Sequence, residues 1–123
     1  MLALKLMLFL GVCAVAVGRA HAEPPATETQ RIDYLIRSVE QLSNAKFIRN
    51  DVAYDAQAAA AHLRLKLREA GSRVKTAEDF IRLCGSRSSM SGQPYQIRFA
   101  DGTHVTSEAF LRAKLGELGA RGK

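Results

Sequence analysis

The chain has 123 residues, and 18 Lys and Arg against 12 Asp and Glu give it a formal net charge of +6. This length suits a single domain and excludes most large enzyme architectures. The sequence has no Trp, two Cys and three His, so the side chains that usually carry redox, metal and nucleophilic chemistry are scarce. The excess of positive charge is mild and falls short of a polybasic protein.

The first 22 residues have the features of a cleavable export signal. An early cation, Lys5, precedes an apolar run over residues 6–17, and Ala20 and Ala22 occupy the small-residue positions of a cleavage site. The run is shorter than the about 20 apolar residues that a membrane anchor needs, and an uncleaved anchor is the alternative. We expect cleavage after Ala22, a periplasmic location and no membrane-spanning segment in the processed protein.

A single globular domain is predicted over residues 30–119. Residues 23–29 contain two prolines and no apolar period, which is typical of a flexible lead-in. Residues 120–123 are expected to form a flexible tail. The sequence has no internal repeat and no domain boundary after Thr29.

Four helices are predicted within this domain. The first covers residues 29–43, and the second starts after Asp55, a capping residue, and ends at Gly71. A short third helix starts at Thr76, and the fourth is the last element of the chain. Apolar residues at helical spacing define all four: Ile32, Leu35, Ile36, Val39 and Leu42; Ala56, Ala59, Ala60, Leu63, Leu67 and Ala70; Ala77, Phe80, Ile81 and Cys84; Leu111, Leu115 and Leu118.

Short strands are predicted on both sides of the central helices. Residues 46–49 are an extended candidate and precede the turn signal Asn50-Asp51. Residues 95–99 alternate apolar and polar side chains, and the Asp101-Gly102 turn leads to a partner strand at residues 103–105. The expected fold class is therefore α+β, with about four helices and a small two- or three-stranded antiparallel sheet.

Several motifs follow one another in a spaced order along the chain. They are Phe47-Ile48-Arg49-Asn50, Tyr54, Ala60-x-His62-Leu63-x-x-Lys66, Phe80-Ile81 and Ser88-Ser89-x-Ser91-Gly92-x-x-Tyr95. In this combination the chain resembles, over residues 32–118, a small exported family known as domain of unknown function 5329. The resemblance implies a proteobacterial periplasmic protein and supplies no activity. Asn50-Asp51 departs from the usual Asn-Gly turn, because Asp adopts a left-handed conformation less readily than Gly.

The irregular segment over residues 85–94 is the best candidate for a ligand site. Serine hydroxyls, two glycines and Arg87 are groups that hold an anion such as a carboxylate or a phosphate. The candidate ligand-binding residues are Ser86, Arg87, Ser88, Ser89, Ser91, Tyr95 and Arg98. The alternative is a solvated loop whose hydroxyls cap its own turns.

Cys84 is the one cysteine left after the predicted cleavage. It shares a helical stripe with Phe80 and Ile81, which predicts a buried and unreactive thiol. The alternative is a reactive thiol with His62 or His104 as its base. Since these two are the only remaining imidazoles and lack the spacing of metal ligands, we expect no metal site, and we expect no cofactor.

The second helix carries several basic residues. Arg64 and Arg68 share one face, and Lys66 and Arg73 are close in sequence, which we interpret as a solvated basic face. The alternative is a surface that attracts anionic lipid, cell-wall polymer or nucleic acid. His62, at the edge of the apolar arc, is expected to be partly buried and hydrogen-bonded. Nucleic acid is not an expected partner, because the chain is predicted to be exported and has no recognised binding motif.

These features favour a non-catalytic binding or interaction module of the cell envelope, with an envelope protein or an anionic ligand as its partner. No catalytic residue is assigned. The alternative is a small envelope enzyme or a thiol-based sensor that uses Cys84. A structural accessory subunit is the third possibility and would expose a contiguous apolar patch, around Leu65 for example.

Overall fold

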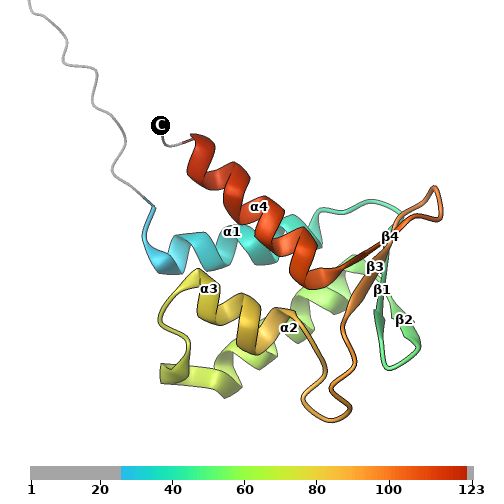
Figure 1. The fold of residues 1–123 in the computed structure, drawn as a ribbon, viewed down its shortest axis with the longest axis horizontal. Helices are drawn as coiled ribbons and strands as arrows, with labels where there is room; N and C mark the ends of the chain where they lie inside the picture. Colours follow the sequence, from blue (N-terminus) through green and yellow to red (C-terminus); the bar gives the residue numbers. More distant parts are fainter. Residues whose placement is uncertain (1–25, 122–123) are drawn as a thin grey trace, which may run out of the picture.

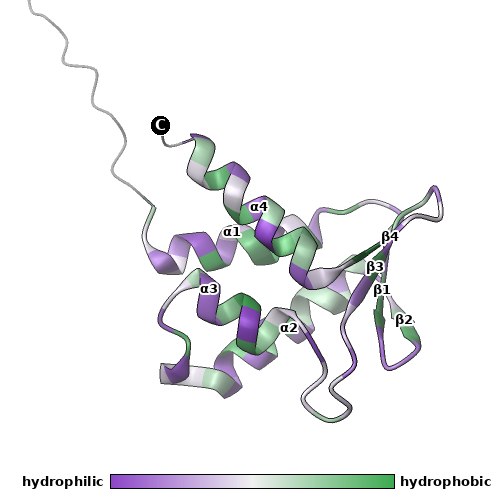
Figure 2. Cartoon of the chain, in the orientation of Figure 1, coloured by the Kyte–Doolittle hydropathy of each residue, from purple (hydrophilic) through white to green (hydrophobic). Residues whose placement is uncertain are grey.

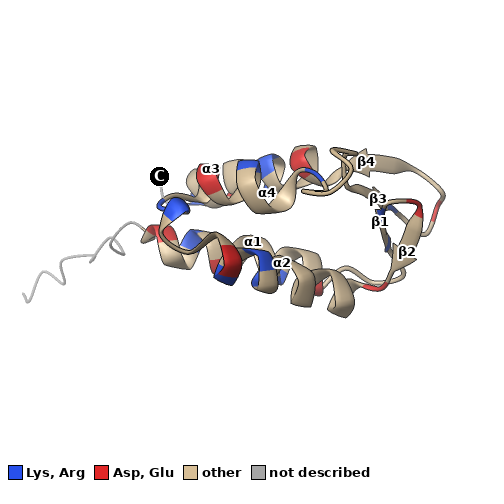
Figure 3. Ribbon diagram, turned by 90° about the horizontal axis from the view of Figure 1, so that it is seen from below, with Lys and Arg blue, Asp and Glu red and all other residues tan. Residues whose placement is uncertain are grey.

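Two layers of helices meet a small antiparallel sheet at one end of the molecule (Figures 1 and 3). The computed structural model describes residues 26–121, so the predicted export signal lies outside the described residues. The helices are α1 (Glu28–Glu40), α2 (Ala56–Ala70), α3 (Ala77–Phe80) and α4 (Ser107–Arg121), with a 3-10 turn η1 (Gly71–Arg73) and a π-helical turn η2 (Ile81–Gly85). The strands are β1 (Lys46–Arg49), β2 (Val52–Tyr54), β3 (Gln96–Arg98) and β4 (His104–Thr106). The predicted α+β class is confirmed.

The sheet has four strands in the order β2-β1-β3-β4, which corrects the predicted count of two or three. The additional strand is β2, which pairs with β1 across the turn at Asn50 and Asp51. Both turn residues adopt left-handed backbone conformations, with φ angles of 50° and 64°. Positive φ at both central positions is the geometry that matches the twist of a hairpin. The tight turn therefore forms without glycine.

Local capping fixes the ends of the helices. Thr27 and Gln30 form a capping box at the start of α1, which ends at Glu40, three residues before the predicted end at Ser43. The side chain of Asp55 accepts a hydrogen bond from the backbone of α2, and Gly71, with a φ of 53°, ends that helix as predicted. Thus α1 starts within the predicted lead-in, and α4 extends into the predicted tail.

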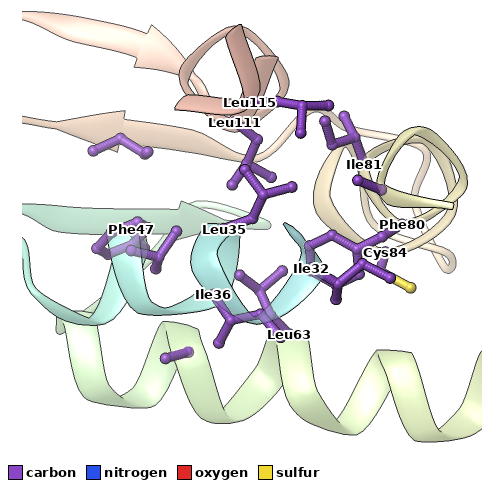
Figure 4. Packing of buried hydrophobic residues seen from close by; sticks show 14 of the residues in the cluster. Ile32, Leu35, Ile36, Phe47, Leu63, Phe80, Ile81, Cys84, Leu111 and Leu115 are labelled. Carbon is purple, nitrogen blue, oxygen red and sulfur yellow. The ribbon is translucent and has the colours of Figure 1, made fainter. Parts of the chain in front are cut away.

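The core lies where α1 packs against α2, α3 and α4 and where the inner face of the sheet closes the end of the helical layers (Figure 4). Leu35 and Phe80 are fully buried, and Phe47 and Ile97 extend the core onto the sheet. Hydrophobic and hydrophilic residues alternate in bands along the helices, as expected for helices with one buried face (Figure 2). Within residues 26–121, no helix combines the length and the apolarity that crossing a membrane requires.

Candidate functional site

A pocket of about 160 Å³ lies between the inner side of β1 and β2 and the adjoining face of α2. We call it the sheet–helix pocket. Its walls are largely apolar, and a small set of polar side chains lines it together with them. The lining residues are Val39, Phe47, Ile48, Arg49, Tyr54, Ala58, Ala59, His62, Leu63, Tyr95 and Ser107. Apolar walls with a few convergent polar groups are the usual composition of a small-molecule site.

Arg49 is the charged residue of the pocket lining. Strand alternation turns it toward the same side of the sheet as Phe47, where it meets α2. Its Nη1 lies 2.9 Å from Nδ1 and 3.2 Å from Nε2 of His62, and its Nη2 donates to the Tyr54 hydroxyl at 3.2 Å. The guanidinium carbon also lies 5.0 Å from the centre of the Tyr54 ring, within cation–π range.

His62 and Lys66 lie one turn apart on α2 and both reach Tyr95. Nε2 of His62 is 3.2 Å from the Tyr95 hydroxyl, and Nζ of Lys66 donates to the same oxygen at 3.0 Å. The shorter Arg49 contact assigns the acceptor lone pair of His62 to Nδ1, which leaves Nε2 as the N–H donor to Tyr95. Arg49, His62 and Tyr95 thus form one chain of hydrogen bonds. Lys66, which does not line the pocket, contacts this chain at the Tyr95 hydroxyl.

Positive charge is concentrated around His62. Burial, the Arg49 guanidinium and the Lys66 ammonium together lower the pKa of His62 from its ordinary value of 6.5, and Glu69 opposes them. Among residues 26–121, no acidic side chain forms an ion pair with Arg49 or Lys66. Elsewhere acidic and basic residues are interspersed along the helices (Figure 3). The cluster around the pocket therefore carries positive charge that no ion pair within residues 26–121 compensates.

Lys66 corrects the prediction of a solvated basic face. Its side chain is only 8% exposed and donates to the backbone carbonyl of Arg87 as well as to Tyr95. Arg64 instead forms an ion pair with Glu40 of α1, at 2.8 Å. The aliphatic stem of a lysine packs readily on apolar surface, which allows Lys66 to lie under the loop.

The loop that supplies most of the predicted ligand residues uses its hydroxyls internally. Ser86 is buried and donates to the carbonyl of Ile81 at 2.6 Å. Ser88 is 5% exposed, and its Oγ accepts from the Asn50 side chain at 3.2 Å and from the backbone N–H groups of Met90 and Ser91. These contacts brace the loop against the β1–β2 turn.

The other predicted ligand residues fall in different places. Ser91 donates to the side chain of Asn50, whereas Arg87 and Ser89 have exposed side chains. Arg98 is exposed on the outer face of β3, on the side away from the buried Ile97. Tyr95 alone among the seven lines the sheet–helix pocket. The structure thus separates Tyr95 from the other six, and their role in ligand binding stays a prediction.

Cys84 is buried as predicted, with an exposure of 1%. Burial raises the pKa of its thiol above the ordinary value, although Lys66 and Arg73 oppose this effect. His104 is exposed on β4, and the hydrogen bonds of His62 run to Arg49 and Tyr95. Within the described residues, no three His, Cys, Asp or Glu side chains group as metal ligands.

Four residues of the polar cluster at the pocket are not among the seven ligand-binding residues predicted from the sequence: Arg49, Tyr54, His62 and Lys66. Of these, the sequence offers only Arg49 as a possible addition to the anion site of the serine loop. One signal in the sequence points to them: His62 and Lys66 stand four residues apart, which places both side chains on one helical face. All four also belong to the spaced motifs that the chain shares with its family. Their convergence on Tyr95 follows only from the packing of α2 against the sheet.

The molecule is thus a small α+β domain with one mixed apolar and basic pocket against its sheet. The sequence model of a family of unknown function (DUF5329) matches residues 26–119. The chain belongs to this family. It is also similar to the uncharacterized protein YfeK of Salmonella typhimurium strain LT2, at 40% identity over 76 residues. That similarity covers 62% of this chain and 63% of YfeK. No solved structure matches the chain.

Proposed function

We propose that this protein is a non-catalytic binding module of the bacterial envelope and that a small molecule binds in its sheet–helix pocket. The observation that carries the proposal is the pocket itself, in which apolar walls from β1 and α2 surround the polar groups of Arg49, His62 and Tyr95. Such a composition is typical of binding sites. The buried Cys84, with its raised pKa, makes the alternative of a thiol enzyme or sensor less favourable.

The envelope location rests on the amino-terminal sequence. Lys5, the apolar run over residues 6–17 and the small residues Ala20 and Ala22 are the features that export signals share. Intact mass of the protein from a periplasmic fraction tests this point. A mass that starts at Glu23 supports export and cleavage, whereas a soluble form that retains Met1 contradicts them.

A titration with benzyl alcohol, a neutral probe about as large as the pocket, tests the binding site. We expect the amide signals of Phe47, Ala59 and Leu63 to shift in two-dimensional NMR spectra of the labelled protein. In the variant Ala59→Leu, which adds volume to the pocket wall, these shifts should vanish. Ala61→Leu places the same side chain on an exposed position of α2 and should leave binding unchanged.

Two results would contradict the pocket as the binding site. One is the absence of shifts at these amides up to about 20 mM benzyl alcohol. A ligand with a Kd of about 1 mM occupies most of the protein at that concentration, so binding of even this modest strength would be seen. The other is equal binding by the Ala59→Leu and Ala61→Leu variants, because a ligand inside the pocket must compete with the added leucine side chain.

A further inference from the structure

Arg49, Tyr54 and Tyr95 line the sheet–helix pocket with groups that can donate hydrogen bonds. Arg49 has no acceptor atom, and its bonds to His62 and Tyr54 use only some of its N–H groups. The Tyr54 hydroxyl accepts from Arg49, so its own hydrogen is free to donate. The Tyr95 hydroxyl accepts from Lys66 and, in the Nε2–H tautomer of His62, from His62 as well, so its own hydrogen is also free to donate.

The hydroxyl groups of Tyr54 and Tyr95 can therefore donate to a ligand. Within residues 26–121, Arg49 donates to the Tyr54 hydroxyl and Lys66 donates to the Tyr95 hydroxyl, and the Nε2–H tautomer of His62 makes it a second donor to Tyr95. Two fixed positive charges, on Arg49 and Lys66, stand beside these hydroxyls without an acidic ion-pair partner in the described chain. An anionic ligand accepts hydrogen bonds from these hydroxyls and also compensates the two positive charges. Hydrogen bonds to a charged group are shorter and stronger than neutral ones.

We infer that the sheet–helix pocket binds a small carboxylate that carries an apolar group about as large as benzene. The carboxylate accepts hydrogen bonds from Arg49, Tyr54 and Tyr95, and the apolar group packs on Phe47 and Leu63. This inference rests on the proposed function and adds the class of the ligand.

The size of the apolar group follows from the pocket volume. At about 160 Å³, the pocket is close in size to the engineered cavity of about 150 Å³ that binds benzene. A fatty-acid chain of ordinary length does not fit this volume. A carboxylate also suits the single guanidinium of Arg49, since its two oxygens match the planar fork of an arginine.

The charges around His62 couple ligand binding to pH. Arg49 on β1, Lys66 and Glu69 on α2, and the Tyr95 hydroxyl are the charged and titratable groups that act on or contact it. A bound carboxylate adds a negative charge beside the ring and offsets the two cations that keep it neutral. Protonation of His62 then becomes easier in the complex, so the affinity for a carboxylate increases as the pH falls.

Benzoate and its neutral counterpart benzamide distinguish an anion site from an apolar pocket. Calorimetry or NMR titration of the purified protein should show that benzoate binds at least about tenfold more tightly, the ratio expected for a hydrogen bond to a charged group. Arg49→Gln should weaken benzoate binding much more than benzamide binding and so remove this preference. Arg68→Gln removes the same charge from an exposed position of the same helix that carries Lys66 and should keep the preference.

The pH dependence of benzoate binding tests whether the carboxylate lies beside His62. Between about pH 7.5 and about pH 5.5 benzoate stays ionised, because carboxyl groups titrate near pH 4. We expect benzoate to bind more tightly at the lower pH, and His62→Gln to flatten this trend. Circular dichroism and thermal unfolding of each variant identify any that fails to fold, and His62→Asn then replaces His62→Gln.

The three probes distinguish a failure of the carboxylate inference from a failure of the proposed binding function. Equal binding of benzoate and benzamide overturns the carboxylate inference and leaves the pocket as a binding site. Binding of phenyl phosphate at least about tenfold tighter than benzoate overturns the carboxylate class in favour of a phosphate. No pocket shift with any of the three probes overturns both the inference and the proposed function.

Discussion

The ammonium of Lys66 lies 3.0 Å from the Tyr95 hydroxyl and 5.1 Å from the centre of its ring. The same ammonium donates to the carbonyl of Arg87 at 3.0 Å, so one buried cation ties α2 to both ends of the loop over residues 87–95. A lysine buried without a carboxylate is held in place by such neutral acceptors. Lys66 therefore orients Tyr95 in the pocket and fixes the loop beside it.

Replacement of Lys66 tests this role. Lys66→Met keeps the apolar stem and removes the three N–H donors, so the Arg87 carbonyl loses this donor and the Tyr95 hydroxyl keeps only its contact with His62. We expect the free energy of unfolding in urea to fall by about 1–3 kcal/mol. Arg68→Met, at an exposed position of α2, should change it by less than about 0.5 kcal/mol. Equal stability of the two variants would show that the buried ammonium contributes nothing to the fold.

Ser88 and Ser89 are adjacent, yet the structure gives them opposite roles. The buried Ser88 hydroxyl accepts three hydrogen bonds, from Asn50 and from the backbone of the loop, whereas Ser89 is exposed. Ser88→Ala should therefore lower the free energy of unfolding by about 1–2 kcal/mol, and Ser89→Ala should leave it unchanged. Chemical denaturation of both variants measures the difference. A destabilised Ser89→Ala variant would contradict the described loop geometry.

The helices were predictable because their signals are local. Asp55 and Gly71 at the two ends of α2, and Thr76 with Asp79 at the start of α3, act within a few residues of themselves. Strand β2 is not predictable from its own three residues, because they carry no buried apolar alternation. Its pairing depends on β1 and on the turn between the two strands, which Asn50 braces through Ser88.

The site was less predictable than the fold. Arg49, His62 and Tyr95 come from a strand, a helix and a loop end, and only the packing of these elements brings them together. The burial of Lys66 was missed because charged residues are almost always expected in solvent. The composition of the serine loop favours an anion site, but composition does not show which hydroxyls turn inward.

The stability of the protein should depend on pH through His62. Its pKa is lowered in the folded state, chiefly by burial and by Arg49, so the unfolded chain binds the proton more readily. The free energy of unfolding therefore falls as the pH decreases from about 7.5 through 6.5 and toward the lowered pKa. Glu28 and other carboxyls with lowered pKa values titrate below 4.5 and do not contribute in this range.

Denaturation curves at several pH values measure this trend. In His62→Gln, which does not titrate, the decrease between about pH 7.5 and about pH 5.5 should be smaller than in the natural protein. His104→Gln is the matched control, because His104 is exposed on β4. A decrease that survives in His62→Gln would assign the pH dependence to another group.

Cys84 should react slowly with thiol reagents in the native protein. It is almost fully buried, and the raised pKa keeps the thiol protonated, while the thiolate is the reactive form. Cys84→Ser places a hydroxyl in the same apolar site and should cost about 1–3 kcal/mol of stability. Labelling rates in native buffer and in denaturant provide the comparison. Equal rates would restore the sensor or enzyme hypothesis.

Gly85 has no space for a side chain. A Cβ atom at this position would lie 2.5 Å from Cδ1 of Leu111, a fully buried residue of α4. Gly85→Ala should therefore lower the free energy of unfolding by about 1–3 kcal/mol, the cost of overpacking a filled core. Thermal and chemical unfolding measure it. Gly116→Ala, on the exposed side of α4 with no atom near its added Cβ, should instead stabilise the protein by about 0.5–1 kcal/mol.

A second substitution identifies the cause of the Gly85 effect. Leu111→Ala alone is destabilising because it opens a cavity, but in that background the added methyl of Gly85→Ala enters vacated space. The cost of Gly85→Ala should then shrink by at least about half, a coupling of the size seen between residues in contact. If the two costs simply add, the methyl does not meet Leu111, and the close approach of η2 to α4 is not what requires glycine at this position.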